Sequence, residues 1–275
     1  RIRNTSRYIL GNLYDFDPSK DRVAYADMEE IDRWALYRLQ TVIERTRKAY
    51  ENFQFHIVYT TLYNFCTVDL SALYLDVLKD RLYTSGKAST GRRSAQTAMF
   101  LVLEALTRLL APILTFTAEE VWQSLPAWDG KAMSVHLTQF PEPNAAWADD
   151  KLGDTWKTLI AVRGEISKAM EAARKGKVIG HPLDAAVTVT GPEKLVALLE
   201  KHEEDLRALC IVSGLRVQKG GALQDAFESA EMPGLKVAVA KAGGEKCQRC
   251  WVFSDQLGRD ANHPKICPRC LANLG

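Results

Sequence analysis

The sequence predicts a mainly α-helical protein, in which a helical bundle is followed by a small α+β module and a four-cysteine zinc knuckle. Three observations favour this class. Apolar residues recur at steps of three and four through most of residues 1–126, which is the spacing of helices with one buried face. Short alternating segments, typical of strands, occur only in the second half of the chain. Two Cys-x-x-Cys pairs stand within the last thirty residues.

The first part of the chain, 1–126, is predicted to be the bundle. Helices are expected over 28–53, 54–65, 69–83 and 94–112. The last of these is apolar nearly all round, which predicts a central buried helix. Asp27 and Glu30 are expected to cap the first of these. Thr117 and Glu120 form a Thr-x-x-Glu capping box for a further helix.

The second half is predicted to contain three further parts. Residues 127–149 are rich in Pro, Gly and Asn and are predicted to be a linker. Residues 150–242 are predicted to be a small α+β module that begins with a basic helix, and 243–275 a zinc-binding module. Between positions 155 and 180, six Lys or Arg stand against two Glu, a local charge of +4. A solvated helix face is the alternative interpretation. Strands are expected at 185–191, 214–219 and 235–242, with a helical segment over 193–213.

Composition indicates a globular protein, with 47% apolar and 25% charged residues. The net charge is only +2, so any polyanion would have to be bound by local patches. No apolar run approaches the roughly 20 residues of a membrane span. Cys66 and Cys210 are expected to be buried thiols, and reduced cysteines favour a cytoplasmic location. The chain begins at Arg1 without a methionine, and a fragment of a larger protein is expected.

The four clustered cysteines predict one structural zinc ion. Cys247 and Cys250 form one pair, Cys267 and Cys270 the other, with sixteen residues between the pairs. Each pair offers two thiolates, and four thiolates fill a tetrahedral shell without leaving a position for water or substrate. A redox dithiol would need only one such pair. His263 is interpreted as a bystander.

The surface of the knuckle allows two interpretations. Trp251 follows a ligand directly, and Arg249 and Arg269 stand beside ligands, so that an aromatic ring and positive charge could meet an unpaired RNA base. Alternatively, Trp251 packs on the metal loop and the basic residues offset the −2 charge of a zinc ion bound by four thiolates. Both interpretations stay open at this point.

Several stretches carry a resemblance to a known family. "RIRNTSRYILGNLYDFDP", "YNFCTVDLSALYLDVLKDRLY" and "LAPILTFTAEEVWQSL" resemble the anticodon-binding helical domain of class I aminoacyl-tRNA synthetases of the Ile/Val/Leu/Met group. "GKVIGHPLDAAVTV" and the cysteine-rich tail narrow the resemblance to the C-terminal region of bacterial isoleucyl-tRNA synthetases. A similar four-cysteine finger ends formamidopyrimidine-type DNA glycosylases, which lack such a bundle.

The resemblance implies a part of an enzyme that attaches isoleucine to its tRNA using ATP. The HIGH and KMSKS signatures of the catalytic domain are absent from this sequence, so the chain alone is expected to be inactive, with no catalytic residue, and ATP is expected only in the missing domain. The expected partners are the anticodon stem-loop of isoleucine tRNA and the missing catalytic body. No membrane partner is expected, and the protein should be a monomer. The alternatives are a valyl- or leucyl-type synthetase region and a zinc-stapled protein-interaction domain.

The candidate tRNA contacts form three groups, on the first helix, the basic helix and the knuckle. They are Arg3, Asn4, Arg7, Lys168, Arg174, Lys175, Arg249, Trp251 and Arg269. Base contacts would set identity, and phosphate contacts would set affinity and salt dependence. The residues of the first helix could instead brace the bundle near Asp15 and Asp17. The pair Arg92–Arg93 is a weaker candidate and is interpreted as a solvated helix start.

Overall fold

The computed structural model describes residues 1–221 and 223–274. Contacts divide the chain into two compact units, Arg1–Gly153 and Asp154–Gly275. The four-part division expected from the sequence stays a prediction. Within the described residues, no helix has both the length and the apolar character that crossing a membrane requires.

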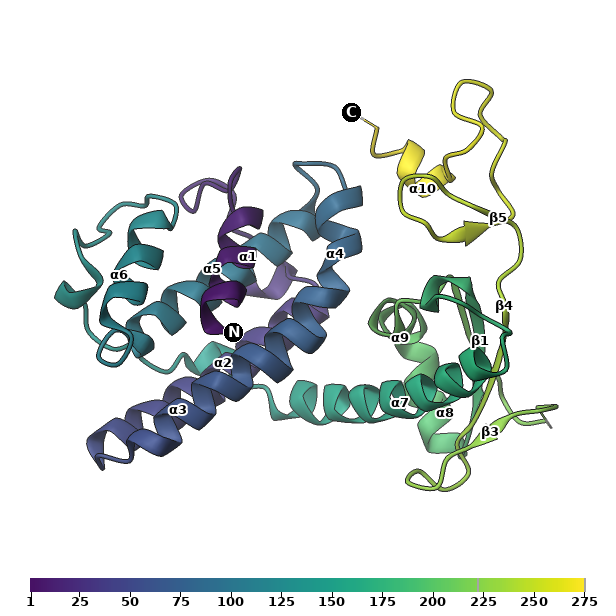
Figure 1. The fold of residues 1–275 in the computed structure, drawn as a ribbon, viewed down its shortest axis with the longest axis horizontal. Helices are drawn as coiled ribbons and strands as arrows, with labels where there is room; N and C mark the ends of the chain where they lie inside the picture. The colour runs from purple at the N-terminus through teal and green to yellow at the C-terminus, as the bar shows by residue number, and fades with distance from the viewer. Residues whose placement is uncertain (222, 275) are drawn as a thin grey trace. The chain divides into compact units, whose positions relative to one another are not determined.

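The first unit is a bundle of helices around α5 (Figure 1). Its helices are α1 (Ile2–Asn12), α2 (Glu30–Glu51), α3 (Phe55–Asn64), α4 (Leu75–Thr84), α5 (Thr90–Leu110) and α6 (Thr115–Ser124). Short 3₁₀ turns lie at η1 (Tyr25–Asp27), η3 (Val135–Leu137) and η4 (Ala145–Trp147). Fifteen residues of α5 are buried, which confirms the prediction of a central buried helix.

A π-helical segment, η2 (Phe65–Tyr74), joins α3 to α4 in one uninterrupted helix. The sequence predicted two helices with a break between 65 and 69, and that break is wrong. No Gly or Pro occurs from Asn52 to Ser85, so nothing in this stretch forces the helix to end. A π turn widens the helix locally and is often found at functional sites.

The predicted caps of two helices are wrong. Helix α2 starts after Glu29, whose side chain makes no capping bond; its backbone N–H instead donates to Ser94 Oγ at 2.9 Å. Helix α6 starts two residues before Thr117, after Leu114, again without a side-chain cap. The start of α2 is therefore held by a contact with α5, which local sequence does not report.

The interpretation of Arg92–Arg93 as a solvated helix start is also wrong. The Arg92 side chain is 6% exposed and donates two hydrogen bonds to the Asp15 carboxylate, at 2.7 and 3.0 Å. Arg93 donates to the Asp15 carbonyl at 2.8 Å and lies 3.4 Å from Asp21. The two arginines thus hold the loop between α1 and α2 onto the start of α5.

Residues 127–149, the expected linker, pack on the bundle. Val135 is buried. The Trp128 ring lies edge-on to Trp122 and Phe100, with centroids 5.4 and 5.3 Å away. The segment therefore contributes to the core of the first unit.

The second unit combines a four-stranded sheet, three helices and the cysteine module. Its helices are α7 (Asp150–Lys175), α8 (Glu193–Lys201) and α9 (Glu203–Cys210), with a short turn η5 (Pro182–Asp184). The sheet has the order β2 (Gly214–Val217), β1 (Ala185–Thr190), β4 (Lys236–Lys241), β3 (Phe227–Glu228). Strand β1 pairs parallel with β2 and antiparallel with β4. The three predicted strands are confirmed, whereas β3 and the break between α8 and α9 were missed.

The cysteine module consists of a hairpin and one helical turn. The hairpin strands are β5 (Glu245–Lys246) and β6 (Phe253–Ser254), and the turn is α10 (Pro268–Leu271). The backbone N–H of Phe253 donates to Ser213 Oγ of the sheet part at 2.8 Å. A hydrogen bond between the backbone of the module and a serine side chain therefore ties the module to the sheet part.

Candidate functional site

The four cysteines come together as one buried cluster. The sulfur atoms of Cys247, Cys250, Cys267 and Cys270 all lie within 4.8 Å of one another, and the four side chains are buried. The Sγ atoms of Cys250 and Cys267 are 3.7 Å apart; zinc–sulfur bonds of about 2.3 Å at tetrahedral angles require about 3.8 Å. His263 is exposed and outside the cluster. The site fits one structural Zn²⁺ ion, as predicted.

The backbone around Cys247 favours its thiolate. Burial by itself would raise the pKa of the Cys247 thiol, but hydrogen bonds from the backbone N–H groups of Cys250, Cys267 and Arg249 lower it to about 6. One of these bonds, from Cys267 N–H to Cys247 Sγ, spans 3.4 Å. Burial instead raises the pKa of the Cys250 and Cys270 thiols, so these two ligands would lose their protons as the ion binds. Cys66 and Cys210 are buried outside the cluster, as predicted, and burial raises the pKa of both thiols to about 12.

The two arginines of the knuckle have structural partners. Arg249 donates from Nη1 to the carbonyls of Cys270 and Asn273, at 2.8 and 2.9 Å, and so closes the C-terminal end of α10. Arg269 donates to the Cys250 sulfur, where its charge offsets that of a thiolate. The contact of Arg269 agrees with the charge-offset interpretation, whereas the contacts of Arg249 are with the backbone.

Trp251 is held outward in an unusual backbone conformation. Its φ is 66°, a region that bulky residues rarely occupy. Its N–H donates to the Cys247 carbonyl at 2.9 Å, which closes the first Cys-x-x-Cys turn. The side chain is 59% exposed, and Lys246 Nζ lies 5.6 Å from the ring centroid. The ring is thus more exposed than buried, with Lys246 of the metal loop beside it.

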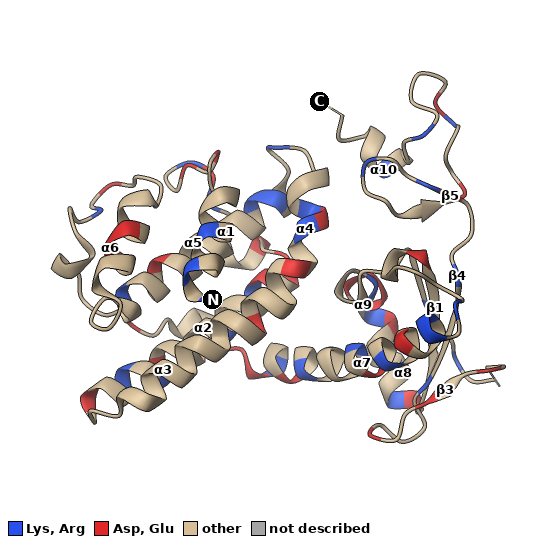
Figure 2. Cartoon of the chain, viewed as in Figure 1, with Lys and Arg blue, Asp and Glu red and all other residues tan. Residues whose placement is uncertain are grey.

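The candidates on α7 differ in their surroundings. Lys168 Nζ lies between two carboxylates, 2.8 Å from Glu165 and 2.6 Å from Glu231. Arg174 pairs with Glu171. Lys175, exposed, has no ion pair among the described residues. Basic residues recur along α7 (Figure 2), and since the carboxylate partners belong to Lys168 and Arg174, its positive charge is compensated only in part.

The candidates on α1 lie on the surface of the bundle. Arg3 makes a two-pronged hydrogen bond to Glu120, with both distances 2.6 Å, and both side chains are more than half exposed. Arg7 is exposed and has no ion pair within the described part of the chain. The expected bracing of Asp15 comes instead from Arg92 and Arg93, on α5.

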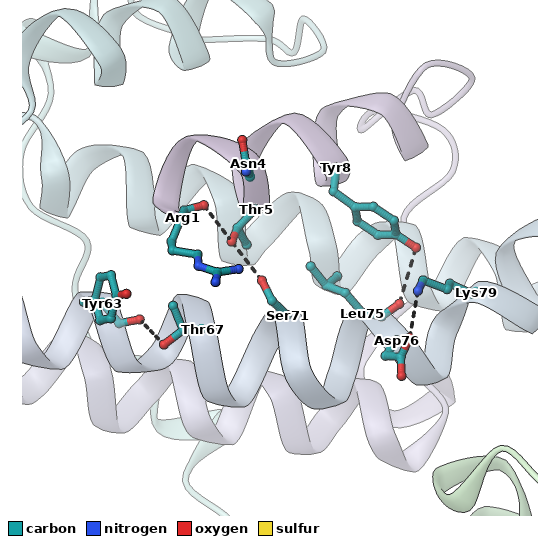
Figure 3. Close-up of a pocket in the computed structure, with 10 residues that line it drawn as sticks. All are labelled: Arg1, Asn4, Thr5, Tyr8, Tyr63, Thr67, Ser71, Leu75, Asp76 and Lys79. Carbon is teal, nitrogen blue, oxygen red and sulfur yellow. Dashed lines mark hydrogen bonds and ion pairs between the residues drawn. The ribbon is translucent and has the colours of Figure 1, made fainter. Parts of the chain in front are cut away.

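Asn4 lines a cleft of about 470 Å³ between α1 and the helix that runs through η2. The lining residues are Arg1, Asn4, Thr5, Tyr8, Tyr63, Thr67, Ser71, Leu75, Asp76 and Lys79 (Figure 3). Thr5 Oγ1 and Ser71 Oγ lie 3.0 Å apart, and Tyr8 donates to the Leu75 carbonyl. The cleft is thus a polar site rather than an extension of the core.

The π segment keeps the lining residues of the cleft on one side. Five of them are spaced by four: Tyr63, Thr67, Ser71, Leu75 and Lys79. In an α-helix such positions drift by about 40° per step. A π turn, with its i→i+5 hydrogen bonds, contains more than four residues, so positions four apart rotate in the opposite direction there. The two rotations offset each other, and the row stays on one side of the helix. Sequence reasoning missed this row, although its spacing was visible.

The structure brings together the four cysteines and places Asn4 at the cleft. Arg3, Asn4 and Arg7 belong to the first unit, and the other six candidate tRNA contacts belong to the second. The candidates on α1 therefore form a surface of the first unit, and those on α7 and on the finger belong to the second unit.

Comparisons with known proteins match most of the chain. A family model described as the anticodon-binding domain of tRNA ligase matches residues 32–189, and one described as a zinc finger found in FPG and IleRS matches residues 244–273. Over 275 residues, all of this chain, it is 49% identical to an isoleucine–tRNA ligase of Syntrophotalea carbinolica. Its identity to the isoleucine–tRNA ligase of Geobacter sulfurreducens is 48% over 99% of the chain, and to that of Moorella thermoacetica 45% over 98%. The chain spans 29% of the length of each. The expected resemblance is confirmed.

Proposed function

The chain belongs to the family of anticodon-binding domains of tRNA ligases, and on this premise we propose that it is the region of an isoleucine–tRNA ligase that recognises the anticodon. One observation carries the specific assignment: the anticodon-binding match and the four-cysteine finger occur in one chain. Relatives named isoleucine–tRNA ligase align with nearly its full length. These relatives favour an isoleucyl-type over a valyl- or leucyl-type origin.

In this proposal the chain holds the anticodon stem-loop of isoleucine tRNA while a catalytic body outside it attaches isoleucine with ATP. The chain contains neither HIGH nor KMSKS, so the reaction belongs to that body. Bases of an unpaired loop can turn outward and offer their edges and faces to side chains. The zinc ion, when bound, supplies a rigid centre for the finger and no chemistry of its own. We place the protein in the cytoplasm as a monomer.

The candidate contacts would contribute unequally. Arg7 and Lys175 have no carboxylate partner among the described residues, so each is available to a phosphate or a base. Arg3 would have to leave Glu120, which costs little because exposed ion pairs are weak. Lys168 already has two carboxylates within 2.8 Å. Arg249 and Arg269 hold the finger together. We therefore assign RNA contact first to Asn4, Arg7, Lys175 and Trp251.

The test is a filter-binding comparison at 150 mM salt of purified isoleucine, valine and leucine tRNAs. The zinc-loaded chain should bind isoleucine tRNA most tightly, and an isoleucine tRNA with a changed anticodon should lose that preference. Equal affinity for all three tRNAs would contradict the proposal and favour a protein-interaction domain.

A further inference from the structure

Four aromatic side chains lie in a row along the α2–α3 turn and one side of α3. We call this row the aromatic ladder; it consists of Phe53, Phe55, Tyr59 and Tyr63. Phe53, Phe55 and Tyr59 are 78%, 52% and 58% exposed. The rings of Tyr59 and Tyr63 stack with centroids 5.5 Å apart, and those of Phe53 and Phe55 meet edge-on at 6.2 Å. The ladder thus consists of two ring pairs, Phe53–Phe55 and Tyr59–Tyr63.

Packing of the bundle explains the ladder only in part, since the Phe55 ring meets the Tyr50 ring of α2 edge-on, with centroids 6.2 Å apart. The core side of α3 is formed by Val58 and Leu62, which are 0% and 1% exposed. Phe55, Tyr59 and Tyr63 are spaced by four and so share the other side of the helix. Phe53 has a φ of 56°, which is unfavourable for a large side chain. Contiguous exposed apolar surface of this kind usually marks a binding site.

The ladder leads into the polar cleft. Tyr63 is both its last ring and a lining residue of the cleft, next to Thr67 one helical turn further on (Figure 3). Asn4, another lining residue, stands on α1, and its side chain can donate and accept hydrogen bonds. Flat apolar faces therefore continue directly into a polar recess of about 470 Å³.

Charge around the ladder favours a polyanion. The sequence has no Asp or Glu from Asn52 to Val68, although Glu44 and Glu51, both exposed, stand near the end of α2. Arg45 and Lys48, on the last two turns of α2, are exposed and have no ion pair in the part of the chain that the structure describes. No Leu, Ile or Val of α3 is exposed, although aliphatic side chains would be expected on a surface that binds a protein through apolar contact. Aromatic rings beside unpaired cations match a single-stranded nucleic acid.

We propose that the aromatic ladder stacks successive unpaired bases of the anticodon loop and that the cleft receives the base nearest Tyr63. This inference rests on the proposed function and adds to it the surface on which the loop lies. Stacking tolerates any base, so the ladder supplies affinity. Hydrogen bonds in the cleft, from Asn4 and Thr67, supply the discrimination between bases.

The test uses the zinc-loaded chain and an isoleucine-tRNA anticodon stem-loop that carries 2-aminopurine in the loop. Kd and 2-aminopurine quenching are measured at 150 mM salt for Tyr59→Ala, Tyr59→Leu and Tyr59→Phe. The Ala and Leu variants should bind about 5- to 100-fold more weakly, since they lose one base–aromatic stack, and should show less quenching. Tyr59→Phe keeps the ring and should bind like the parent. Phe116→Ala, which removes a ring that is 90% exposed on α6, should also bind like the parent.

The outcomes distinguish failure of the aromatic ladder from failure of the proposed function. Parent-like affinity and quenching in both Tyr59→Ala and Tyr59→Leu would overturn the ladder and leave the proposed function intact. Parent-like affinity in Tyr59→Leu alone would mean that Tyr59 offers only apolar contact, as to a protein, and would overturn stacking. If the unaltered chain shows no preference for the isoleucine stem-loop, the proposed function fails and the ladder fails with it. Because Tyr59 is exposed, all variants should keep the parent's thermal unfolding midpoint.

Discussion

Single side chains in this protein have roles that their positions in the sequence do not reveal. Arg92 was interpreted as solvated because it stands near a helix start, yet it is buried against Asp15. Trp251 was left undecided, and its φ of 66° turns the ring outward. The partner of Arg92 is distant in sequence, and the backbone conformation of Trp251 cannot be read from its neighbours.

Removing the Arg92 side chain should strongly destabilise the first unit. Arg92→Ala leaves the part-buried Asp15 carboxylate without its main partner, and loss of one member of such a pair costs ~3 kcal/mol of unfolding free energy. Urea denaturation of the parent, Arg92→Ala and Arg92→Lys measures this. The Lys variant should lose less because it keeps the charge, although it cannot make both hydrogen bonds. A parent-like midpoint for the Ala variant would contradict the role of the pair.

Asp15 should also give the bundle part of its acid sensitivity. Burial raises the pKa of Asp15, but hydrogen bonds from Arg92 and Gln96 outweigh it and hold the pKa below the ordinary value of 3.8. A lowered pKa means that the ionised group stabilises the fold fully above about pH 4 and that this contribution disappears as the pH falls through the folded-state value. The stability difference between the parent and Asp15→Asn should therefore shrink below about pH 4. A difference independent of pH would contradict this.

Replacing Trp251 by glycine should preserve or raise the stability of the finger and weaken its binding to RNA. Trp251→Gly relieves a left-handed backbone that costs a bulky residue about 1 kcal/mol, so the zinc-loaded finger should be at least as stable as the parent. Both Trp251→Gly and Trp251→Ala should bind isoleucine tRNA about 1–3 kcal/mol more weakly through loss of a base stack. Unfolding and filter-binding measurements on the same samples test the direction of the change in stability and in RNA affinity. Unchanged affinity in a zinc-loaded variant would reject the stacking role.

At the scale of elements, the periodic helices and the alternating strands were predictable. Spacing of three and four placed α2 and α5, and alternation placed β1, β2 and β4. The caps of α2 and α6 were not predictable, because they depend on neighbours such as Ser94. The π segment was missed because its widening leaves no composition signal, only a row of residues four apart. For the site, cysteine spacing was sufficient; the cleft required two helices to be placed side by side.

The hairpin of the finger depends on one glycine. Gly244 has a φ of 80°, and an added Cβ would lie 2.3 Å from the Ser254 carbonyl carbon, a distance that real structures do not tolerate. Gly244→Ala should therefore disturb the β5–β6 pairing and weaken zinc binding by at least about tenfold, since the change costs more than about 1 kcal/mol. Gly243→Ala is the matched control because nothing lies within 4 Å of its added Cβ. Competition with a chromophoric chelator measures both, and equal zinc affinity would contradict the role of Gly244.

At the scale of the whole molecule, the two units have separate cores. The cysteine cluster gathers few apolar neighbours, namely Val252, Leu257 and Ile266. So small a core cannot hold a fold by itself. The stability of the finger should therefore come from the metal, whereas the bundle depends on its buried helices.

Chelation should consequently unfold one region and spare the other. Zinc binding contributes about 10–16 kcal/mol to the folding free energy of small finger peptides. Its removal should therefore expose residues 244–273 to protease. The bundle should keep its helical circular dichroism and its unfolding temperature. Elemental analysis should return one zinc per chain before treatment. A fall in the unfolding temperature of the bundle after chelation would show that the two units are not independent.

The wide turn inside the long helix has a consequence for evolution. One residue advances an α-helix by about 100°, so deleting or inserting a single position between Phe65 and Tyr74 would swing everything after it by more than a quarter turn. Leu75, which follows the segment, would then leave the core, and Lys79 would leave the cleft. This stretch should therefore accept many substitutions but no insertion or deletion. Among related sequences, its length should vary less than the identity of its residues.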